Sequence, residues 1–121
     1  MDILLVGLAG SLGAIGRYLI YQIERSFPPH NFPFATLFIN LVGCFIAGLV
    51  LGFATKALPH QKHHFMLFSI GFVGSFTTFS TLTVETLQLA QHSFPLAAIA
   101  NVLLNFILGV LLVWIGQSIT I

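Results

Sequence analysis

The stretch Gly71–Thr83 holds the residues whose types and spacing are best suited to ion chemistry. It lies in an apolar run long enough to cross a bilayer, yet it contains two glycines and, before its last residue, five hydroxyl side chains. Backbone N–H and C=O groups need partners in hydrocarbon, so irregular backbone at that depth occurs only inside protein or beside a water-filled or ion-filled cavity. Glycine permits the dihedral angles of a helix break, and the helix ends at such a break expose groups that hold ions. The stretch therefore predicts an ion site at a broken helix, built largely from backbone.

Three asparagines stand in otherwise apolar runs and are candidates for a polar path. Asn40 lies between Ile39 and Leu41. Its amide either bonds a neighbouring helix or lines a path and donates to an anion. The other polar residues within the apolar runs favour the path. Asn101 and Asn105 are four residues apart, so they share one helical face. They either line the same path or bond to the next helix, and the spacing leaves both alternatives open.

Phe76, Phe79 and Leu82 repeat at threefold spacing. Such a stripe usually marks a helix face in a protein core. A second use is open to the two aromatic rings, because the edge of a phenyl ring is positive. Ring edges can coordinate a weakly hydrated anion without binding it too tightly to leave. The spacing favours core packing and keeps anion contact as the alternative.

Two charged residues lie inside apolar runs. An arginine at the centre of a membrane helix costs about 2.5–3.5 kcal/mol, but Arg17 is near the end of its run. Its guanidinium either snorkels to the interface, ties to the C-terminal carbonyls of another helix, or attracts anions to a vestibule. Glu85 follows the hydroxyl-rich stretch, where it would cap a vestibule, sit at the membrane interface or carry protons.

The remaining polar residues do not predict catalysis. His60, His63 and His64 have a spacing that could ligate a metal on one helical face. No cysteine or carboxylate is near them, and we expect a solvated loop there. The sequence has no nucleophile–base pair, no glycine-rich phosphate loop and no metal cluster. We therefore expect that the protein is not an enzyme.

Composition indicates the class of protein that must position these residues. Of 121 residues, 57% are hydrophobic and 6% are charged, whereas soluble domains carry about 25% charged residues. A bilayer-crossing helix needs roughly 20 mostly apolar residues, and four runs meet this length. We predict an all-α membrane protein with a single transmembrane domain, residues 1–121, whose spans are about 3–23, 32–55, 65–91 and 96–119.

The ends and the net charge exclude some alternatives. The first apolar run lacks a basic leader region and a convincing cleavage site, so we expect a span rather than a signal peptide. The net charge of +1 gives no reason to expect nucleic acid as a partner. We expect no extramembrane domain.

Loop charge and glycine spacing predict how the spans associate. Lys56 and Lys62 lie on one side and Arg25 on the other, so the Lys/Arg bias that normally sets orientation is nearly nil. Either the topology depends on another feature, or the chain inserts both ways and pairs antiparallel. Glycines at threefold spacing in the first span, and the pair Gly48 and Gly52, predict faces for close helix approach. A homo-oligomer would bury the polar residues better than a monomer.

Three motifs in this order resemble the Fluc (CrcB) fluoride channel family. They are Gly10-Ser-Leu-Gly-Ala-Ile-Gly-Arg17-Tyr18, Thr36-Leu-Phe-Ile-Asn40-Leu-Val-Gly43 and Gly71-Phe-Val-Gly74-Ser-Phe-Thr77-Thr78-Phe79-Ser80-Thr81. The likeness covers all four spans and nearly the whole length, and the third motif is the most specific.

The resemblance implies an antiparallel, dual-topology homodimer in the lipid of the bacterial inner membrane, with two pores that export fluoride passively and reduce its toxicity. It implies a third helix broken at its centre, where the backbone carbonyls of Gly74 and Thr77 from both subunits hold a structural sodium ion. The other implied site residues are those of the anion path (Asn40, Phe79, Ser80 and Thr81), the first-helix Arg17, and Glu85 just past the break.

Two departures from the family pattern concern the same path. Leu82 stands where most members have a second phenylalanine, so one ring contact is absent, and we expect conduction to survive with a changed rate or selectivity. Asn101 and Asn105 stand where a tyrosine and a serine are expected. They keep the wall polar but change its shape, and we count both, with Leu82, among the candidate path residues.

Two other functions compete with a channel. A small proton-coupled exporter of drugs or other cations also uses four short spans and dual topology, but it needs a carboxylate inside the membrane. The first span has none, and Glu85 is the one candidate elsewhere. A non-transporting accessory subunit would not need a hydroxyl-rich break. The residues therefore favour the channel.

Overall fold

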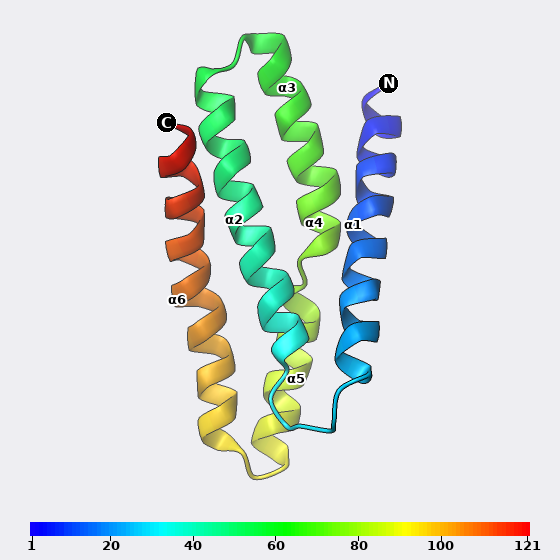
Figure 1. Cartoon of the computed structure of the whole chain (residues 1–121), viewed down its shortest axis with the longest axis vertical. Coiled ribbons are helices and arrows are strands. Elements are labelled where there is room, and N and C mark those ends of the chain that lie inside the picture. Colours follow the sequence, from blue (N-terminus) through cyan, green and yellow to red (C-terminus); the bar gives the residue numbers. More distant parts are fainter.

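Four helical rods lie side by side, and the computed structural model describes all 121 residues (Figure 1). Three rods are single helices, whereas the third is interrupted, and both chain termini lie at the same end of the molecule (Figure 1). In chain order the elements are α1 (Asp2–Arg25), α2 (Phe34–Lys56), α3 (Pro59–Phe68), the π-helical η1 (Ser69–Val73), α4 (Gly74–Phe76), α5 (Phe79–Gln91) and α6 (Pro95–Thr120).

Each of the four rods is long and apolar enough to cross a membrane. The protein is therefore an all-helical, multi-pass membrane protein, as the composition predicts. Only 19 of 121 residues are buried within the chain, because most large apolar side chains point outward. In a bilayer that outward surface meets lipid, and helix association depends on close packing and hydrogen bonds rather than on removing apolar surface from water.

Proline and one distant carboxylate define where the helices begin. Pro59 and Pro95 occupy the first turns of α3 and α6, where their missing N–H is not needed. Helix α2 follows Pro33, which has no side-chain cap. Its open N-terminus is capped from α1 instead, since the Ala35 N–H donates to Glu24 Oε1 at 2.9 Å. A carboxylate is also favoured there by the helix dipole.

Glycines bring α2 and α6 into backbone contact over the half nearer the termini. A Cβ added to Gly48 would collide with the Val113 carbonyl, and one added to Gly52 would lie 2.8 Å from the Gln117 carbonyl oxygen. Gly116 lies equally close to the backbone of α2. The predicted small-residue pair therefore packs against the fourth rod of the same chain.

The glycine face of α1 packs against the third rod. A Cβ at Gly13 would collide with the Phe72 carbonyl, and one at Gly71 would lie 2.6 Å from the Val6 carbonyl oxygen. Gly7 is different, because a Cβ there would meet nothing within 4 Å. This face therefore serves packing within the chain, and its first glycine is left open.

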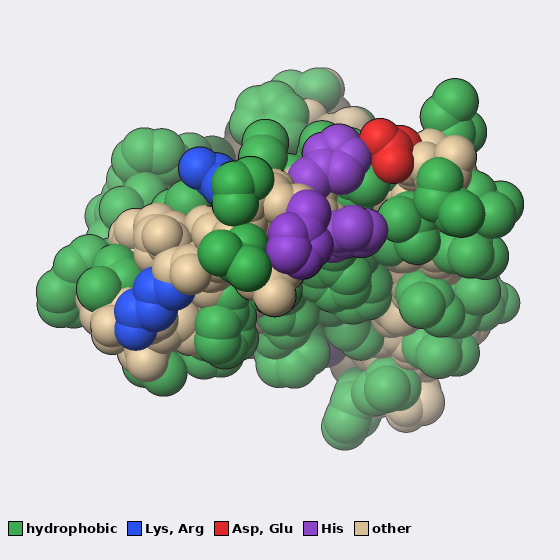
Figure 2. All heavy atoms as spheres, turned by 90° about the horizontal axis from the view of Figure 1, so that it is seen from above, with side chains coloured by type: hydrophobic (Ala, Val, Ile, Leu, Met, Phe, Trp, Pro, Cys, Tyr) green, Lys and Arg blue, Asp and Glu red, His purple; other side chains and the backbone are tan.

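The predicted loop over residues 56–64 is wrong in part, because α3 already begins at Pro59. The Leu58 N–H donates to Gln61 Oε1 at 3.1 Å and the Lys62 N–H to the Leu58 carbonyl at 2.8 Å, so the capped turn extends the helix. His63 Nε2 lies 2.9 Å from Asp2 Oδ2. Figure 2, seen from this end, shows the histidines gathered beside an acidic side chain.

Candidate functional site

The third rod is broken at Thr77 and Thr78, which join α4 to α5 in extended backbone. Their φ and ψ angles are −74° and 161°, and −148° and 112°. Thr78 caps α5, since its Oγ1 accepts from the Thr81 N–H at 3.2 Å and donates to Thr81 Oγ1 at 2.9 Å. No glycine has a positive φ, so the prediction that glycine supplies the dihedral angles of the break is wrong. The break is made by threonine, a β-branched residue that favours extended backbone.

Asn40 of α2 holds the break by pairing with both backbone groups of Thr78. The Thr78 N–H donates to Asn40 Oδ1 at 2.9 Å, and Asn40 Nδ2 donates to the Thr78 carbonyl at 3.2 Å. In an unbroken helix that N–H would go to the Gly74 carbonyl. A side-chain amide thus replaces the helical partner, which allows the chain to leave helix within a membrane span.

A series of amides continues from Asn40 into α6 and returns to α5. Asn40 Nδ2 donates to Asn105 Oδ1 at 2.8 Å, and Asn105 Nδ2 donates to the backbone oxygen of Asn101 at 2.8 Å and to its Oδ1 at 3.2 Å. Asn101 Nδ2 donates to Thr86 Oγ1 at 3.0 Å. We call Asn40, Asn105, Asn101 and Thr86 the amide ladder. Its asparagines are all buried.

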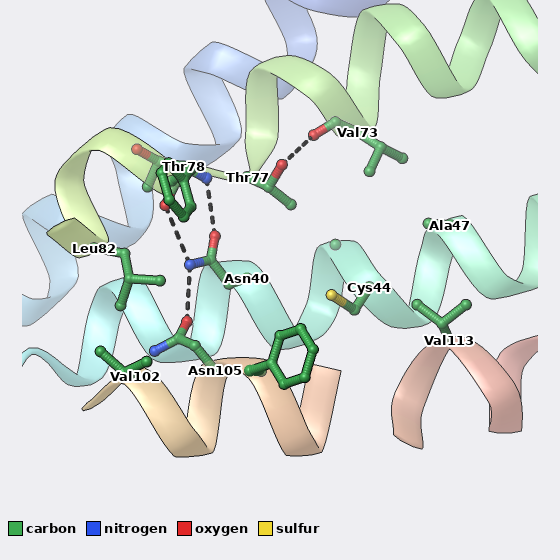
Figure 3. A pocket seen from close by; sticks show the side chains of 13 residues that line it. Asn40, Cys44, Ala47, Val73, Thr77, Thr78, Leu82, Val102, Asn105 and Val113 are labelled. Carbon is green, nitrogen blue, oxygen red and sulfur yellow. Dashed lines mark hydrogen bonds between the residues drawn. The ribbon is translucent and has the colours of Figure 1, made fainter. Parts of the chain in front are cut away.

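A groove of about 390 Å³ opens beside the break (Figure 3). Asn40 and Asn105 border it together with apolar side chains, whereas Asn101 does not line it. None of its lining residues is charged; they are Asn40, Gly43, Cys44, Ala47, Val73, Thr77, Thr78, Phe79, Leu82, Val102, Asn105, Phe106 and Val113.

The break separates the three residues of the apolar stripe. Phe76 is 5% exposed and stacks on Phe72, with ring centroids 5.6 Å apart. Phe79, on the far side of the break, is 78% exposed and borders the groove. Leu82 lines the groove as well. Phe76 is therefore a core residue of this chain, whereas Phe79 lies at the surface of the single chain, because extended backbone resets the helical spacing between them.

The hydroxyls of the stretch differ in their surroundings. Ser80 is exposed and Thr81 is half-buried against Thr78, and neither of them lines the groove of this single chain. Thr81 Oγ1 accepts the bond from Thr78 and keeps its own proton free to donate.

Arg17 reaches the break from α1. Its Nη1 donates to the Thr77 carbonyl at 3.3 Å, just past the C-terminus of α4. Of the three alternatives for this residue, the tie to another helix's C-terminal carbonyl is the one that the structure contains. Gly74 lies nearby with open space around it, since an added Cβ would meet nothing within 4 Å.

Glu85 lies where α5 approaches the start of α2. Thr36 Oγ1 donates to Glu85 Oε1 at 2.8 Å, and the Tyr21 and Thr36 hydroxyls lie 2.9 Å apart. The second carboxylate oxygen is buried without a hydrogen-bond partner. Glu85 also borders a polar cavity of about 230 Å³ with His30 and other side chains at the end of the rods.

Sequence reasoning gave no role to Tyr21, Thr36 or Thr86. Thr36 is four residues before Asn40, so the helical period could have placed it on the same face as that asparagine. Nothing in the spacing of Tyr21 or Thr86 identifies their partners, because each contact joins separate helices.

Comparison with known proteins places this sequence in a family. The model of the family described as CrcB-like protein, Camphor Resistance (CrcB), matches residues 4–117. Relatives described as fluoride-specific ion channel FluC cover nearly the whole chain. The one from Dehalococcoides mccartyi is 36% identical over 115 residues, 95% of this chain and 88% of the relative. The one from Campylobacter lari is 41% identical over 114 residues (94% and 93%), and the one from Shewanella frigidimarina is 43% identical over 119 residues (97% and 94%).

Proposed function

The chain belongs to the CrcB family, whose relatives are described as fluoride-specific ion channels, and from this premise we propose that it is a fluoride-specific channel. It lets fluoride leave the bacterial cell down its gradient through the inner membrane, and it is not an enzyme. The observation that carries this function is the break in the third rod beside a groove with amide and hydroxyl groups and no charged lining residue. Such a lining presents polar groups to an anion without a fixed charge that would trap it.

The proposed anion path runs along the first turn of α5. The exposed Phe79 ring, with its positive edge, the free proton of the Thr81 hydroxyl and the exposed Ser80 offer weak positive contacts. Of these three residues only Phe79 lines the groove, which Asn40 borders from α2 and to which Leu82 adds an aliphatic part of the wall. Several weak contacts in sequence favour entry of an anion and still allow it to leave.

A second copy of the chain, inserted in the opposite direction, is the proposed partner. The groove opens at the surface of the single chain, and Phe79 beside it is 78% exposed. Polar backbone at a break is tolerated in a membrane only inside protein or beside a water-filled cavity, which supports a cover for this face. The nearly balanced loop charges support insertion in both directions.

The proposed sodium site fits the groups at the break. The Thr78 N–H bonds to Asn40, so the Gly74 carbonyl lacks the donor that an unbroken helix would supply, and the space around Gly74 is open. The Thr77 carbonyl already accepts from Arg17 but has a second lone pair. Two carbonyls from one chain are too few for a cation that takes several oxygens. Gly74 and Thr77 would therefore hold sodium together with the same groups of a second copy, and the ion would join the two breaks.

Arg17 and Glu85 border the path in this proposal without conducting the ion. Arg17 fixes the C-terminal end of α4 through the Thr77 carbonyl. Glu85, held by Thr36, lies at the polar cavity near the end of the rods, and we place it at the vestibule.

Fluoride efflux from liposomes tests this function. Purified protein is reconstituted with internal fluoride, a potassium ionophore clamps the membrane potential, and an electrode follows fluoride outside. A channel releases fluoride at the same rate with and without a proton gradient. No release above that of empty liposomes contradicts the function, and release that requires a proton gradient favours a coupled transporter instead.

A further inference from the structure

The orientation of every amide in the ladder follows from one backbone group. The Thr78 N–H can only donate, so the oxygen of the Asn40 amide must face it. The Asn40 nitrogen then faces the Thr78 carbonyl and Asn105, which must present its oxygen in return. The Asn105 nitrogen in turn points at Asn101, where it has two acceptors. The ladder thus runs in one direction, donor to acceptor, as Figure 3 shows for its first bonds.

This direction leaves Asn40 with no free donor. Its amide nitrogen carries two hydrogens; one goes to the Thr78 carbonyl at 3.2 Å and the other to Asn105 Oδ1 at 2.8 Å. Asn105 offers the groove no donor either, because its own hydrogens go to Asn101. An anion that binds to Asn40 must therefore displace one of these two oxygens.

We propose that Asn105 sets the anion affinity of Asn40, because its side-chain oxygen takes the amide hydrogen that would otherwise bind the anion, and that Asn101 fixes Asn105 in this orientation. This inference rests on the proposed function and adds a positioning role for two residues of α6. An anion forms a stronger bond with the amide than a neutral oxygen does, so it takes the hydrogen as it arrives. The Asn105 oxygen retakes the hydrogen as the anion leaves, which shortens its stay.

Asn101 is well placed for the second part of this role. It is fully buried and lies outside the groove, so it does not touch a passing ion. Its backbone oxygen and Oδ1 both accept from Asn105, and its own amide is bonded to Thr86 of α5. Without these acceptors the Asn105 amide can turn its nitrogen toward Asn40, where two donors repel.

The concentration dependence of fluoride efflux tests the inference with three variants of the full chain. Asn105→Leu frees the Asn40 hydrogen, so the half-saturating fluoride concentration falls roughly tenfold, the size of one bond to a charged group, and the maximal rate falls with it. Asn105→Asp keeps the size and the acceptor oxygen but adds repulsion, so the half-saturating concentration rises. Asn101→Leu acts in the same direction as Asn105→Leu, with a smaller change.

Opposite signs for Asn105→Leu and Asn105→Asp separate this role from simple damage to the fold. Leu104→Val is the control, on an exposed residue of α6 outside the groove. We expect it to leave the half-saturating fluoride concentration and the maximal rate unchanged. A half-saturating concentration that is unchanged or raised in Asn105→Leu overturns the inference while the parent still conducts. If Asn105→Leu gives no monodisperse protein, Asn101→Leu decides by the same criterion. A silent parent overturns the inference and the proposed function together.

Discussion

Helices α2 and α6 meet in two different ways along one shared interface. Over one half, Gly48, Gly52 and Gly116 bring backbone against backbone with no room for a Cβ. Over the other half, Asn40 and Asn105 join the helices by a side-chain hydrogen bond and border the groove. Close packing and hydrogen bonding are the two ways in which membrane helices associate. Only the second leaves polar groups beside an open space, so the glycine half has a structural role and the amide half is the one that we propose serves the ion.

The glycine half gives the largest expected effect. Gly48→Ala places a Cβ against the Val113 carbonyl, and such overpacking costs about 1–3 kcal/mol or more because backbone must move. We expect a strong loss of monodisperse protein in size-exclusion chromatography. Gly7→Ala is the matched control, since its Cβ meets nothing within 4 Å. Equal yields for the two variants would show that the α2–α6 contact is not so close.

The amide half gives the next effect, on transport rather than on folding. Asn40→Asp keeps the acceptor for the Thr78 N–H but loses both donated bonds and adds a negative charge beside the groove. We expect fluoride efflux to fall at least about tenfold, which corresponds to roughly 1.4 kcal/mol. Gln91→Glu, an equivalent change at the exposed end of α5, is expected to conduct. Intact efflux in Asn40→Asp would show that Asn40 does not face the anion.

Leu82 gives the smallest expected effect, because it adds no polar contact to the groove. Leu82→Phe introduces a second ring edge, whose positive rim would face an anion in the groove. We expect a severalfold change in fluoride efflux rate or in selectivity over chloride, with conduction kept in both proteins. Unchanged rate and selectivity would show that this part of the wall does not contact the ion.

The sequence predicts the general form of this site better than its details. The hydroxyl residues in an apolar run predicted the break in the third span, and the single asparagine of the second span predicted that Asn40 has polar neighbours. Both predictions follow from the cost of exposing polar groups to lipid without hydrogen-bond partners. The sequence misassigned the break to glycine, whereas Thr77 and Thr78 make it. It could not give the direction of the ladder, since two asparagines four residues apart look the same whichever atom of each amide accepts.

The interruption of the third rod explains why helical periodicity gave a wrong prediction at this point of the chain. A helical repeat predicts that Phe76 and Phe79 share one face, and two extended residues between them send one ring into the core and the other to the surface. The predicted start of the third rod was wrong for a similar reason, since the capping hydrogen bond from Leu58 to Gln61 makes a polar connection helical. Such local bonds are decided by geometry that a count of apolar residues does not contain.

The reversal potential of the purified protein in a planar bilayer, with fluoride on one side and chloride on the other, tests the central claim most directly. The groove beside the break has amide and hydroxyl groups and no charge among its lining residues, and the chain belongs to a family of fluoride channels. We predict current carried by fluoride, so that with equal concentrations of the two anions the reversal potential lies far from zero, with the sign that opposes the flow of fluoride. Equal permeability to the two anions, or a silent protein, would contradict the claim.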